Sequence, residues 1–328
     1  MVAAGGPDAG SDAGADAGPD AGPDAGPDAG PPSAGAIRTV FVIVLENRSW
    51  SAIKGSSSAP YLNGTLLPAY AHADDYRGPF GGYLHPSEPN YLWLEAGDSF
   101  GKIDDKDPAV NHQPTREHLV SKLEDQGFSW RSYQEGIADG TCPLTSVGKY
   151  APKHNPMVFF DDVINYTPAG GPDVHAPRCI ANVKPLTQLE LDLPAGSVGR
   201  YNFLTPDLCN DGHDSCPPLM DPIKQSDQWL ATWVPKILAS PAYKDNGAIF
   251  ITWDEAEAGS FDCLLGNCPI GMIVISPLGK SGGYANSIAY DHSSTLKTVQ
   301  EIFGLTPLLR HAGDAAVSDL RDLFNTFP

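Results

Sequence analysis

Several stretches of the chain are continuous runs of apolar and β-branched residues, the longest from Arg38 to Leu45. A strand that is apolar on both faces is typical of a parallel sheet covered by helices on both sides. The pattern predicts five such strands: Arg38–Leu45, Ser129–Tyr133, Tyr201–Leu204, Ala248–Trp253 and Ile270–Ser276.

Segments with apolar residues at helical spacing lie between these strands. Thr115–Gln126 ends at Gly127, Ser226–Ala239 carries two tryptophans, and Ser294–Phe303 ends at Gly304. A further helix is expected from Ser87, which is a good N-cap, to a stop at Gly97. Strands that alternate with helices predict a single α/β domain at residues 37–328, with a mostly parallel central sheet flanked by helices on both faces.

The first 36 residues have a different composition. From Gly6 to Pro32 the chain repeats Pro-Asp-Ala-Gly with small variations and contains no aromatic or large aliphatic residue. Such a segment cannot bury enough apolar surface to offset the entropy of ordering, so residues 1–36 are expected to be a disordered spacer that tethers the domain at a surface. Met1–Gly6 has no signal-peptide apolar core, so we expect an export signal to have been removed.

The charge balance is strongly acidic, with a formal net charge of −19. Six aspartates of the repeat contribute to it, yet the remaining chain is still acidic and has no basic stretch. This argues against nucleic-acid binding as the main function. No apolar run approaches the length of a transmembrane segment. A small anionic substrate would need local positive charge, which a metal ion would supply.

The chain contains six cysteines, and the simplest pairing is Cys142–Cys179, Cys209–Cys216 and Cys263–Cys268. Fifteen pairings are available in principle, and free buried thiols or a zinc site are the alternatives. No Cys-x-x-Cys spacing occurs, which favours disulfides over zinc. Disulfides predict a secreted or extracytoplasmic protein, at the cell surface or in the periplasm.

Acidic residues follow two of the predicted strands directly, namely Glu46 and the pair Asp254 and Glu255. Because ligands of α/β sheets bind at the carboxyl ends of strands, these side chains are expected to lie close together. Carboxylates that gather in one place must take up a proton or share a cation, and oxygen ligands suit Mg, Ca, Mn or Zn. The alternative is that they are solvated loop residues.

Ser87 opens a predicted helix, where free N–H groups and the helix dipole favour negative charge. This is a place for a phosphate group and for a serine nucleophile, although a plain structural cap is the simpler alternative. Lys153 and Arg48 could supply fixed positive charge, but we interpret both as solvated surface residues.

Six motifs occur in one order along residues 38–306. They are Val42-Ile-Val-Leu-Glu46-Asn47-Arg48-Ser49, His85-Pro-Ser87-x-Pro89-Asn90-Tyr91, Tyr150-Ala-Pro-Lys-His154-Asn-Pro156, Asn202-Phe-Leu-Thr-Pro206-Asp207-x-x-Asn210-Asp211-x-His213-Asp214, Thr252-Trp-Asp254-Glu255 and Asp291-His292-Ser293-Ser294. With these motifs the chain resembles the bacterial and fungal phosphoesterase family of secreted acid phosphatases and phospholipases C, within the alkaline phosphatase-like superfamily. Its compact size is most similar to that of secreted acid phosphatases, including those acting on phosphatidylinositol 3-phosphate.

The resemblance implies a role for each matching residue. It implies that a single divalent metal ion is bound by four residues and that Ser87 is the nucleophile. His213, with carboxylates around it that would keep it protonated at mildly acidic pH, would be the general acid, and His292 is a second catalytic candidate. The metal-binding residues would be Glu46, Asn47, Asp254 and Glu255, and the substrate-binding residues His85, His154 and Asn90.

Two departures from related families narrow the reaction. Tyr91 occupies the position at which sulfatases carry an arginine, and the histidine set of two-zinc alkaline phosphatases is not evident. The sequence therefore predicts metal-dependent hydrolysis of a small phosphomonoester or a phosphoinositide. The alternatives are a phosphodiesterase or phospholipase C of the same family, a non-catalytic surface module that binds sugar or protein, and a purely structural display domain.

Overall fold

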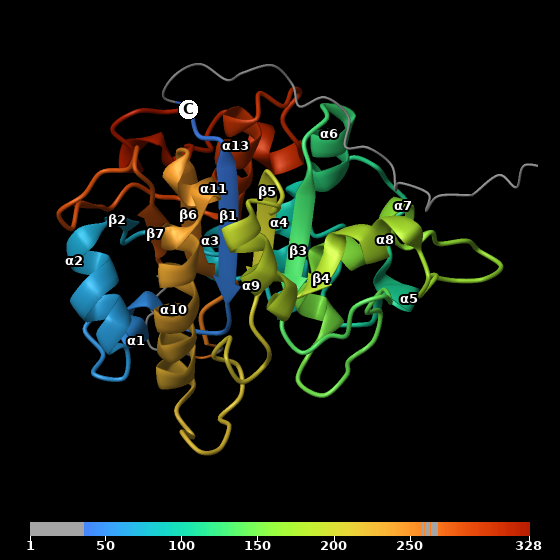
Figure 1. Cartoon of the computed structure of the whole chain (residues 1–328), viewed down its shortest axis with the longest axis horizontal. Coiled ribbons are helices and arrows are strands. Elements are labelled where there is room, and N and C mark those ends of the chain that lie inside the picture. Colours follow the sequence, from blue (N-terminus) through green and yellow to red (C-terminus); the bar gives the residue numbers. More distant parts are fainter. Residues whose placement is uncertain (1–35, 258, 260–262, 264–267) are drawn as a thin grey trace, which may run out of the picture.

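The computed structural model describes residues 36–257, 259, 263 and 268–328, and the predicted spacer lies outside them apart from Ala36. An eight-stranded sheet in the order β4-β3-β5-β1-β6-β7-β2-β8 runs through the described part of the chain (Figure 1). The strands are β1 Thr39–Leu45, β2 Ala71–Ala73, β3 Trp130–Gln134, β4 Val183–Pro185, β5 Tyr201–Thr205, β6 Gly247–Trp253, β7 Met272–Ile275 and β8 Ala285–Asn286.

Neighbouring strands in this sheet are parallel except where β7 pairs with β6 and with β2. The prediction of a mostly parallel α/β sheet is confirmed. The five predicted strands are all present within one to two residues of their expected ends. Sequence reasoning missed β2, β4 and β8, because runs of two or three residues carry too little periodicity to be recognised.

Helices cover both faces of the sheet, as predicted. Figure 1 shows α9 and α10 in front of the strands, and α4 and α13 behind them. The helices are α1 Trp50–Ile53, α2 Leu67–Ala69, α3 Pro79–Gly82, α4 Ser87–Ala96, α5 Pro108–Asn111, α6 Leu119–Asp125, α7 Asp161–Ile164, α8 Pro177–Asn182, α9 Leu186–Ala195, α10 Pro222–Ala239, α11 Pro241–Lys244 and α13 His292–Ile302. A π-helical turn spans Leu62–Leu66, and 3-10 turns span Pro152–His154, Pro156–Phe159, Arg310–Gly313 and Leu320–Leu323.

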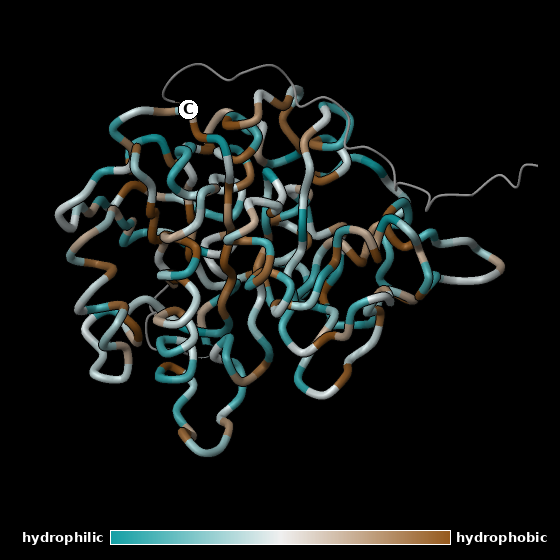
Figure 2. The backbone as a smooth tube through the Cα atoms, in the orientation of Figure 1, coloured by the Kyte–Doolittle hydropathy of each residue, from teal (hydrophilic) through white to brown (hydrophobic). Residues whose placement is uncertain are grey.

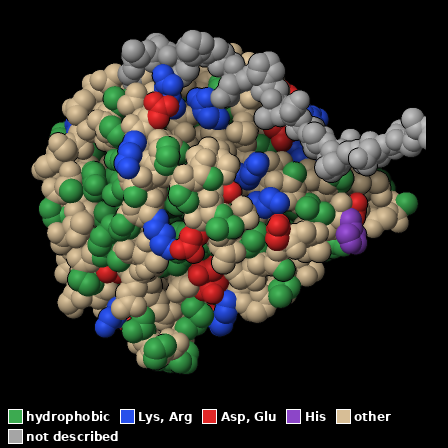
Figure 3. Space-filling model, in the orientation of Figure 1, with side chains coloured by type: hydrophobic (Ala, Val, Ile, Leu, Met, Phe, Trp, Pro, Cys, Tyr) green, Lys and Arg blue, Asp and Glu red, His purple; other side chains and the backbone are tan. Residues whose placement is uncertain are grey.

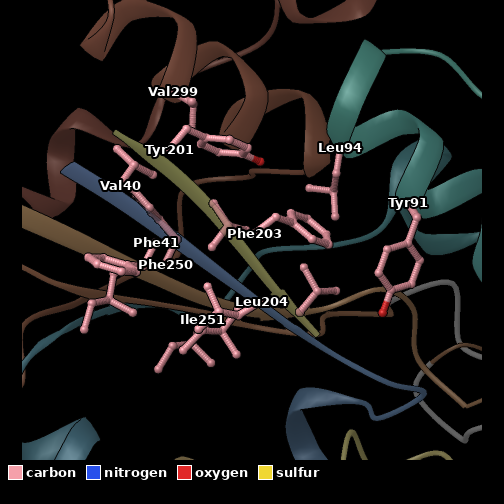
Figure 4. Close-up of a cluster of buried hydrophobic side chains, with 14 of the residues drawn as sticks. Val40, Phe41, Tyr91, Leu94, Tyr201, Phe203, Leu204, Phe250, Ile251 and Val299 are labelled. Atoms are coloured by element: carbon pink, nitrogen blue, oxygen red, sulfur yellow. The ribbon is translucent and has the colours of Figure 1, made fainter. Parts of the chain in front are cut away.

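The core lies on both faces of the central strands, where the tube of Figure 2 is brown, the colour of hydrophobic residues. All seven residues of β1 and of β6 are buried. In Figure 4, Tyr201 and Phe203 of β5 lie towards Leu94 of α4 and Val299 of α13, whereas Leu204 points to the other side of the strands. This two-sided burial explains why these strands read as continuous apolar runs rather than alternating ones.

Local sequence signals set the ends of the helices that matter for the site. Helix α4 ends at Gly97, which adopts φ +71° and donates its N–H to the Trp93 carbonyl at 2.7 Å. A side chain there would also meet the Leu309 carbonyl at 2.9 Å, so a glycine is required. Helix α13 begins two residues earlier than predicted, because Asp291 rather than Ser294 is the N-cap and forms a capping box with Ser294.

Three disulfides have the predicted pairing: Cys142–Cys179, Cys209–Cys216 and Cys263–Cys268. The first joins residues 37 positions apart, whereas the second joins residues only 7 apart. A cross-link that closes a longer loop removes more entropy from the unfolded chain.

Replacing both Cys142 and Cys179 by serine is therefore expected to lower the free energy of unfolding by about 2–4 kcal/mol. The double serine variant of Cys209 and Cys216 is expected to lose about 1 kcal/mol less. Urea titrations of the two variants under identical conditions measure both losses. Equal losses, or the reverse order, would contradict loop closure as the source of the stability.

Within the described ranges, none of the helices has both the length and the apolar character that a membrane span needs. On the face shown in Figure 3, basic and acidic side chains are interspersed. One of the ion pairs joins Lys236 of α10 to Glu190 of α9 at 2.6 Å.

Candidate active site

The carboxyl ends of four neighbouring strands bring acidic and histidine side chains together. Glu46 follows β1 and Asp254 follows β6, while Asp211 lies in the loop after β5. His154 belongs to the 3-10 turn after β3, and its carbonyl accepts a hydrogen bond from the Thr205 hydroxyl at the end of β5. All four side chains are at most 2% exposed. The sheet therefore places buried ionisable groups at the edge where such folds bind ligands.

Glu46 is the centre of this group. Its Oε2 accepts hydrogen bonds from the Ser87 hydroxyl and the Asn47 side-chain amide, both at 3.0 Å, and its Oε1 accepts one from the Tyr91 hydroxyl at 2.6 Å. Asn47 has a φ of +48°, a left-handed conformation that asparagine tolerates, and its backbone N–H donates to Asp254 Oδ1 at 2.9 Å. The turn after β1 thus links Glu46, which follows β1, to Asp254, which follows β6.

Ser87 is the first residue of α4 and is 2% exposed. Pro86 rather than Ser87 is the N-cap of this helix. The Ser87 hydroxyl donates to Glu46. The structural-cap interpretation of Ser87 is therefore wrong, and its hydroxyl points into the group of carboxylates.

The three buried carboxyls repel one another. Burial, followed by the charges of Asp254 and Asp211, raises the pKa of Glu46 well above its usual value. Burial and the charge of Glu255 raise the pKa of Asp254 to about 8, against the lowering effect of neighbouring backbone N–H groups and of the Ser87 hydroxyl. The pKa of Asp211 is raised mainly by burial as well. These groups can ionise together only if positive charge is supplied.

His154 lies between two of these carboxyls. Its Nε2 is 3.2 Å from Glu46 Oε1, its Nδ1 is 3.2 Å from Asp211 Oδ2, and its ring stacks on Tyr91 with centroids 5.1 Å apart. Neither ring nitrogen is far from an acceptor, yet Nε2 has no well-directed hydrogen bond. Burial and the nearby charge of Lys153 hold the pKa of His154 well below its usual value, which favours the neutral ring.

Glu255 belongs to a second group beside the first. Its Oε2 is 2.7 Å from His85 Nδ1 and accepts a hydrogen bond from the Asn90 amide at 3.0 Å. The hydrogen bond to Glu255 raises the pKa of His85 despite partial burial. His85 is 35% exposed along its side chain, so it faces the outside of the site.

The two histidines expected to be catalytic occupy different surroundings. His213 is one-third exposed, its Nδ1 lies 2.8 Å from Asp214 Oδ1, and its ring centroid is 6.1 Å from that of His154. His292 is fully buried, with Nε2 2.7 Å from the Asp254 carbonyl oxygen and Nδ1 3.1 Å from the Tyr76 hydroxyl. Burial lowers the pKa of His292 to about 4. Since protein groups occupy both of its nitrogens, this placement favours a role in positioning Asp254 over proton donation.

Four residues of the site were not assigned to it from the sequence: Asp211, Tyr91, Lys153 and Asp105. Asp211 and Tyr91 lie inside recognised motifs, so their presence there was the available signal. Lys153 was interpreted as a solvated surface residue, but its side chain is only 18% exposed and its Nζ lies 3.0 Å from Asp105 Oδ2. Asp105 comes from a loop without a periodic pattern, and no sequence signal pointed to it.

The donor chemistry of the site fits a hard divalent cation. Glu46, Asp211 and Asp254 offer carboxylate oxygens, and both Asp254 Oδ2 and Asp211 Oδ2 are buried without a hydrogen-bond partner. Among the described residues, however, no three His, Cys, Asp or Glu side chains already form a ready metal-binding cluster. A cation would therefore have to draw these oxygens closer together than they lie here. Two of the predicted metal ligands are engaged in other contacts. Asn47 turns its amide nitrogen towards Glu46, and Glu255 Oε2 is held by His85 and Asn90.

Several proteins of similar sequence are phosphatases. The chain is 30% identical to the phosphatidylinositol-3-phosphatase of Mycobacterium tuberculosis over 266 residues, which cover 81% of this chain and 77% of the other. It is 27% identical to a probable acid phosphatase of Kluyveromyces lactis over 294 residues, which cover 87% of this chain but only 62% of the other. A phosphate-repressible acid phosphatase of Penicillium chrysogenum is 26% identical, with 69% and 51% coverage. The chain thus spans about half to three quarters of the length of these relatives.

Solved structures confirm the fold. A protein of the alkaline phosphatase superfamily from Vibrio parahaemolyticus superposes with a TM-score of 0.57 at 10% identity, covering 86% of this chain and 71% of the other. The phosphonate monoester hydrolase of Agrobacterium radiobacter superposes with a TM-score of 0.55 at 12% identity, with 88% and 77% coverage. At such low identity these likenesses concern the fold alone.

The family model of phosphoesterases matches residues 60–306, a span that contains Ser87, Asp211 and Asp254, while Glu46 lies just ahead of it. The match covers most of the described chain and agrees with the resemblance seen in the six motifs. The chain belongs to the phosphoesterase family.

Proposed function

We propose that this protein hydrolyses phosphomonoesters, with Ser87 as nucleophile and one divalent cation held by Glu46, Asp254 and Asp211. One observation carries the proposal: the Ser87 hydroxyl, at the start of α4, donates a 3.0 Å hydrogen bond to Glu46 within a group of three buried carboxyls. A structural role alone gives no reason to bury three mutually repelling acids beside a hydroxyl. The acid phosphatase relatives support the same reaction class.

In the proposed reaction, the phosphate group of the substrate enters past His85 and His213, the partly exposed histidines of the site. The Ser87 oxygen forms a bond to phosphorus as the bond from phosphorus to the ester oxygen breaks. Glu46 Oε2, which already accepts the Ser87 hydrogen bond, takes the hydroxyl proton. His213 donates a proton to the departing alkoxide. Water then hydrolyses the phosphoserine and restores Ser87.

A bound divalent cation would let the carboxyls ionise together and would neutralise charge on the phosphate oxygens. The chain's own residues orient this arrangement. Tyr91 and Asn47 fix Glu46 by hydrogen bonds, and His292 holds the backbone of Asp254. Positioning of this kind lowers the barrier because the reacting groups need not reorganise during the reaction.

The substrate is a small phosphomonoester or the headgroup of a phosphoinositide. The phosphatidylinositol-3-phosphatase among the relatives supports testing the second. Three disulfides support a location in an oxidising compartment outside the cytoplasm, for which secretion is the proposed route.

A substrate panel tests the proposal. The full chain, supplied with Mg, Ca, Mn or Zn in turn, is assayed between pH 4 and 9 on p-nitrophenyl phosphate, bis(p-nitrophenyl) phosphate, phosphatidylcholine and phosphatidylinositol 3-phosphate. We expect turnover of the monoesters to exceed that of the diesters, and we expect it to vanish in excess EDTA and return with one of the cations. Faster turnover of the diesters would replace the proposal with phosphodiesterase or phospholipase C activity. Full activity in EDTA would exclude a divalent cation from the reaction. No turnover under any condition would favour a binding module.

A further inference from the structure

Lys153 is a cation built into the acidic site. It precedes His154 in the 3-10 turn Pro152–His154, and the ring of His154 lies 3.2 Å from Glu46. Burial raises the pKa of Glu46, Asp211 and Glu255, and the positive charge of Lys153 opposes that rise in all three. Its side chain is 18% exposed, so the ammonium group is neither solvated like a surface lysine nor sealed from a ligand.

Asp105 fixes this lysine relative to the nucleophile. Its Oδ2 lies 3.0 Å from Lys153 Nζ, and its Oδ1 accepts the backbone N–H of Glu88 at 3.0 Å. Glu88 directly follows Ser87 in the first turn of α4. One carboxylate therefore connects the lysine to the helix end that carries the Ser87 hydroxyl.

An ammonium group has three N–H donors, and Asp105 is its one hydrogen-bond acceptor among the described residues. The remaining donors are free for an anion. Arg48, another basic side chain at this edge, is held by the Asn47 carbonyl at 2.7 Å and by Glu257 at 3.5 Å. A phosphomonoester carries two negative charges into a site that holds the buried carboxyls of Glu46, Asp211, Asp254 and Glu255. A fixed cation close to the phosphate oxygens would offset the resulting repulsion.

We propose that Lys153 binds the non-bridging oxygens of the substrate phosphate, and that Asp105 positions it beside Ser87 for this contact. This inference rests on the proposed function, because Lys153 would belong to the same phosphate site. It is tested by measuring the affinity for phosphate, which does not require turnover.

The experiment measures binding of inorganic phosphate to the full chain, equilibrated with the activating cation, by isothermal titration calorimetry. Lys153→Gln is expected to weaken phosphate binding at least tenfold, since charge-assisted hydrogen bonds contribute that much or more. Lys153→Arg, which keeps the charge, is expected to restore most of the affinity. The matched control is Lys184→Gln, because Lys184 has a similarly exposed side chain (21%) and an ion pair to Asp139 at 3.2 Å on the edge strand β4. It is expected to bind phosphate as the unchanged protein does.

Phosphate affinity of Lys153→Gln within about twofold of the unchanged protein would overturn the assignment. If that variant does not fold, Asp105→Asn decides, because it leaves Lys153 in place but removes the ion pair that positions it. This variant is expected to weaken phosphate binding at least threefold and to raise KM more than it lowers kcat. Unchanged affinity in a folded Asp105→Asn protein would likewise overturn the proposal. Loss of phosphate binding in Lys153→Gln, combined with normal turnover in Ser87→Ala, would instead retain the lysine site and reject the proposed nucleophile.

Discussion

Ser87→Ala is expected to reduce kcat for phosphomonoester hydrolysis by at least about 10³-fold, because removing a nucleophile leaves only water to attack. The alanine removes a hydroxyl that donates to Glu46, and Ser87 is not the N-cap of α4, so the fold is expected to remain intact. Steady-state kinetics on p-nitrophenyl phosphate measure the loss. A phosphoryl group on the peptide that contains Ser87, trapped by acid quenching of the unchanged protein and absent from the variant, identifies the intermediate.

A matched control is Ser240→Ala. Ser240 is similarly buried, at 3% exposure, but it caps α11, where its hydroxyl accepts the Tyr243 N–H at 3.2 Å. Loss of that cap is expected to cost about 1 kcal/mol of stability and to leave kcat unchanged. If Ser87→Ala kept activity within tenfold of the unchanged protein, the nucleophile would be another group or water.

Asp254→Asn is expected to have opposite effects on activity and on stability. Loss of one cation-binding carboxylate is expected to lower kcat/KM at least about 100-fold. In the cation-free protein, the same change removes a buried acid whose Oδ2 has no partner, while the asparagine oxygen can still accept the Asn47 N–H. At pH 9 we expect the cation-free variant to be more stable than the cation-free parent by on the order of 2 kcal/mol.

The pH dependence follows from the raised pKa of Asp254, about 8 in the folded protein. In the unfolded chain this carboxyl releases its proton near about pH 4. Between these values the folded state binds the extra proton, so the stabilisation is fully present at low pH and is lost as the pH rises through about 8. Thermal unfolding of the metal-stripped proteins from pH 5 to 9 should therefore show Tm falling more steeply in the parent than in Asp254→Asn.

Asp227→Asn serves as a control for the activity loss. Asp227 is also buried, but it accepts the N–H groups of Tyr61 and Leu62 at 3.0 and 2.8 Å. Its change to asparagine is expected to leave kcat/KM unaffected. Normal activity in Asp254→Asn, or a metal-stripped parent whose Tm does not depend on pH, would contradict the assigned role of this carboxyl.

The sequence was a good guide wherever the signal was local or regular. The run Arg38–Leu45 predicted β1 because a strand covered on both faces must be apolar throughout. Glu46 and Asp254 could be placed together because parallel strands end at the same edge of a sheet. Gly97 marked the end of α4 because it adopts a left-handed conformation there. Short spacing in polar loops suggested the pairs Cys209–Cys216 and Cys263–Cys268, and the simplest pairing left Cys142–Cys179 as the third.

Three interpretations could be decided only from the tertiary structure. Lys153 looked like a surface lysine, and only the approach of Asp105, 48 positions away, shows that it is held inside the site. His292 was expected to be catalytic, but its Nε2 contacts the Asp254 carbonyl oxygen and its Nδ1 contacts the Tyr76 hydroxyl. Ser87 could have been a cap by its sequence, but Pro86 is the N-cap of α4 and the Ser87 hydroxyl donates to Glu46, 41 positions earlier.

By itself, then, the sequence determined the five longer strands, the helices α4, α6, α10 and α13, the acidic residues that follow β1 and β6, and the family. Periodicity, turn residues and motifs are properties of neighbouring residues, so they can be recognised without the fold. Only the tertiary structure decided which loop residues join Glu46 and Ser87 and which stay outside. Asp105, Lys153 and Asp211 come from irregular segments whose positions are fixed by contacts with distant parts of the chain. Such contacts leave no periodic trace along the sequence, so their partners become visible only when the strands have brought them to the same edge of the sheet.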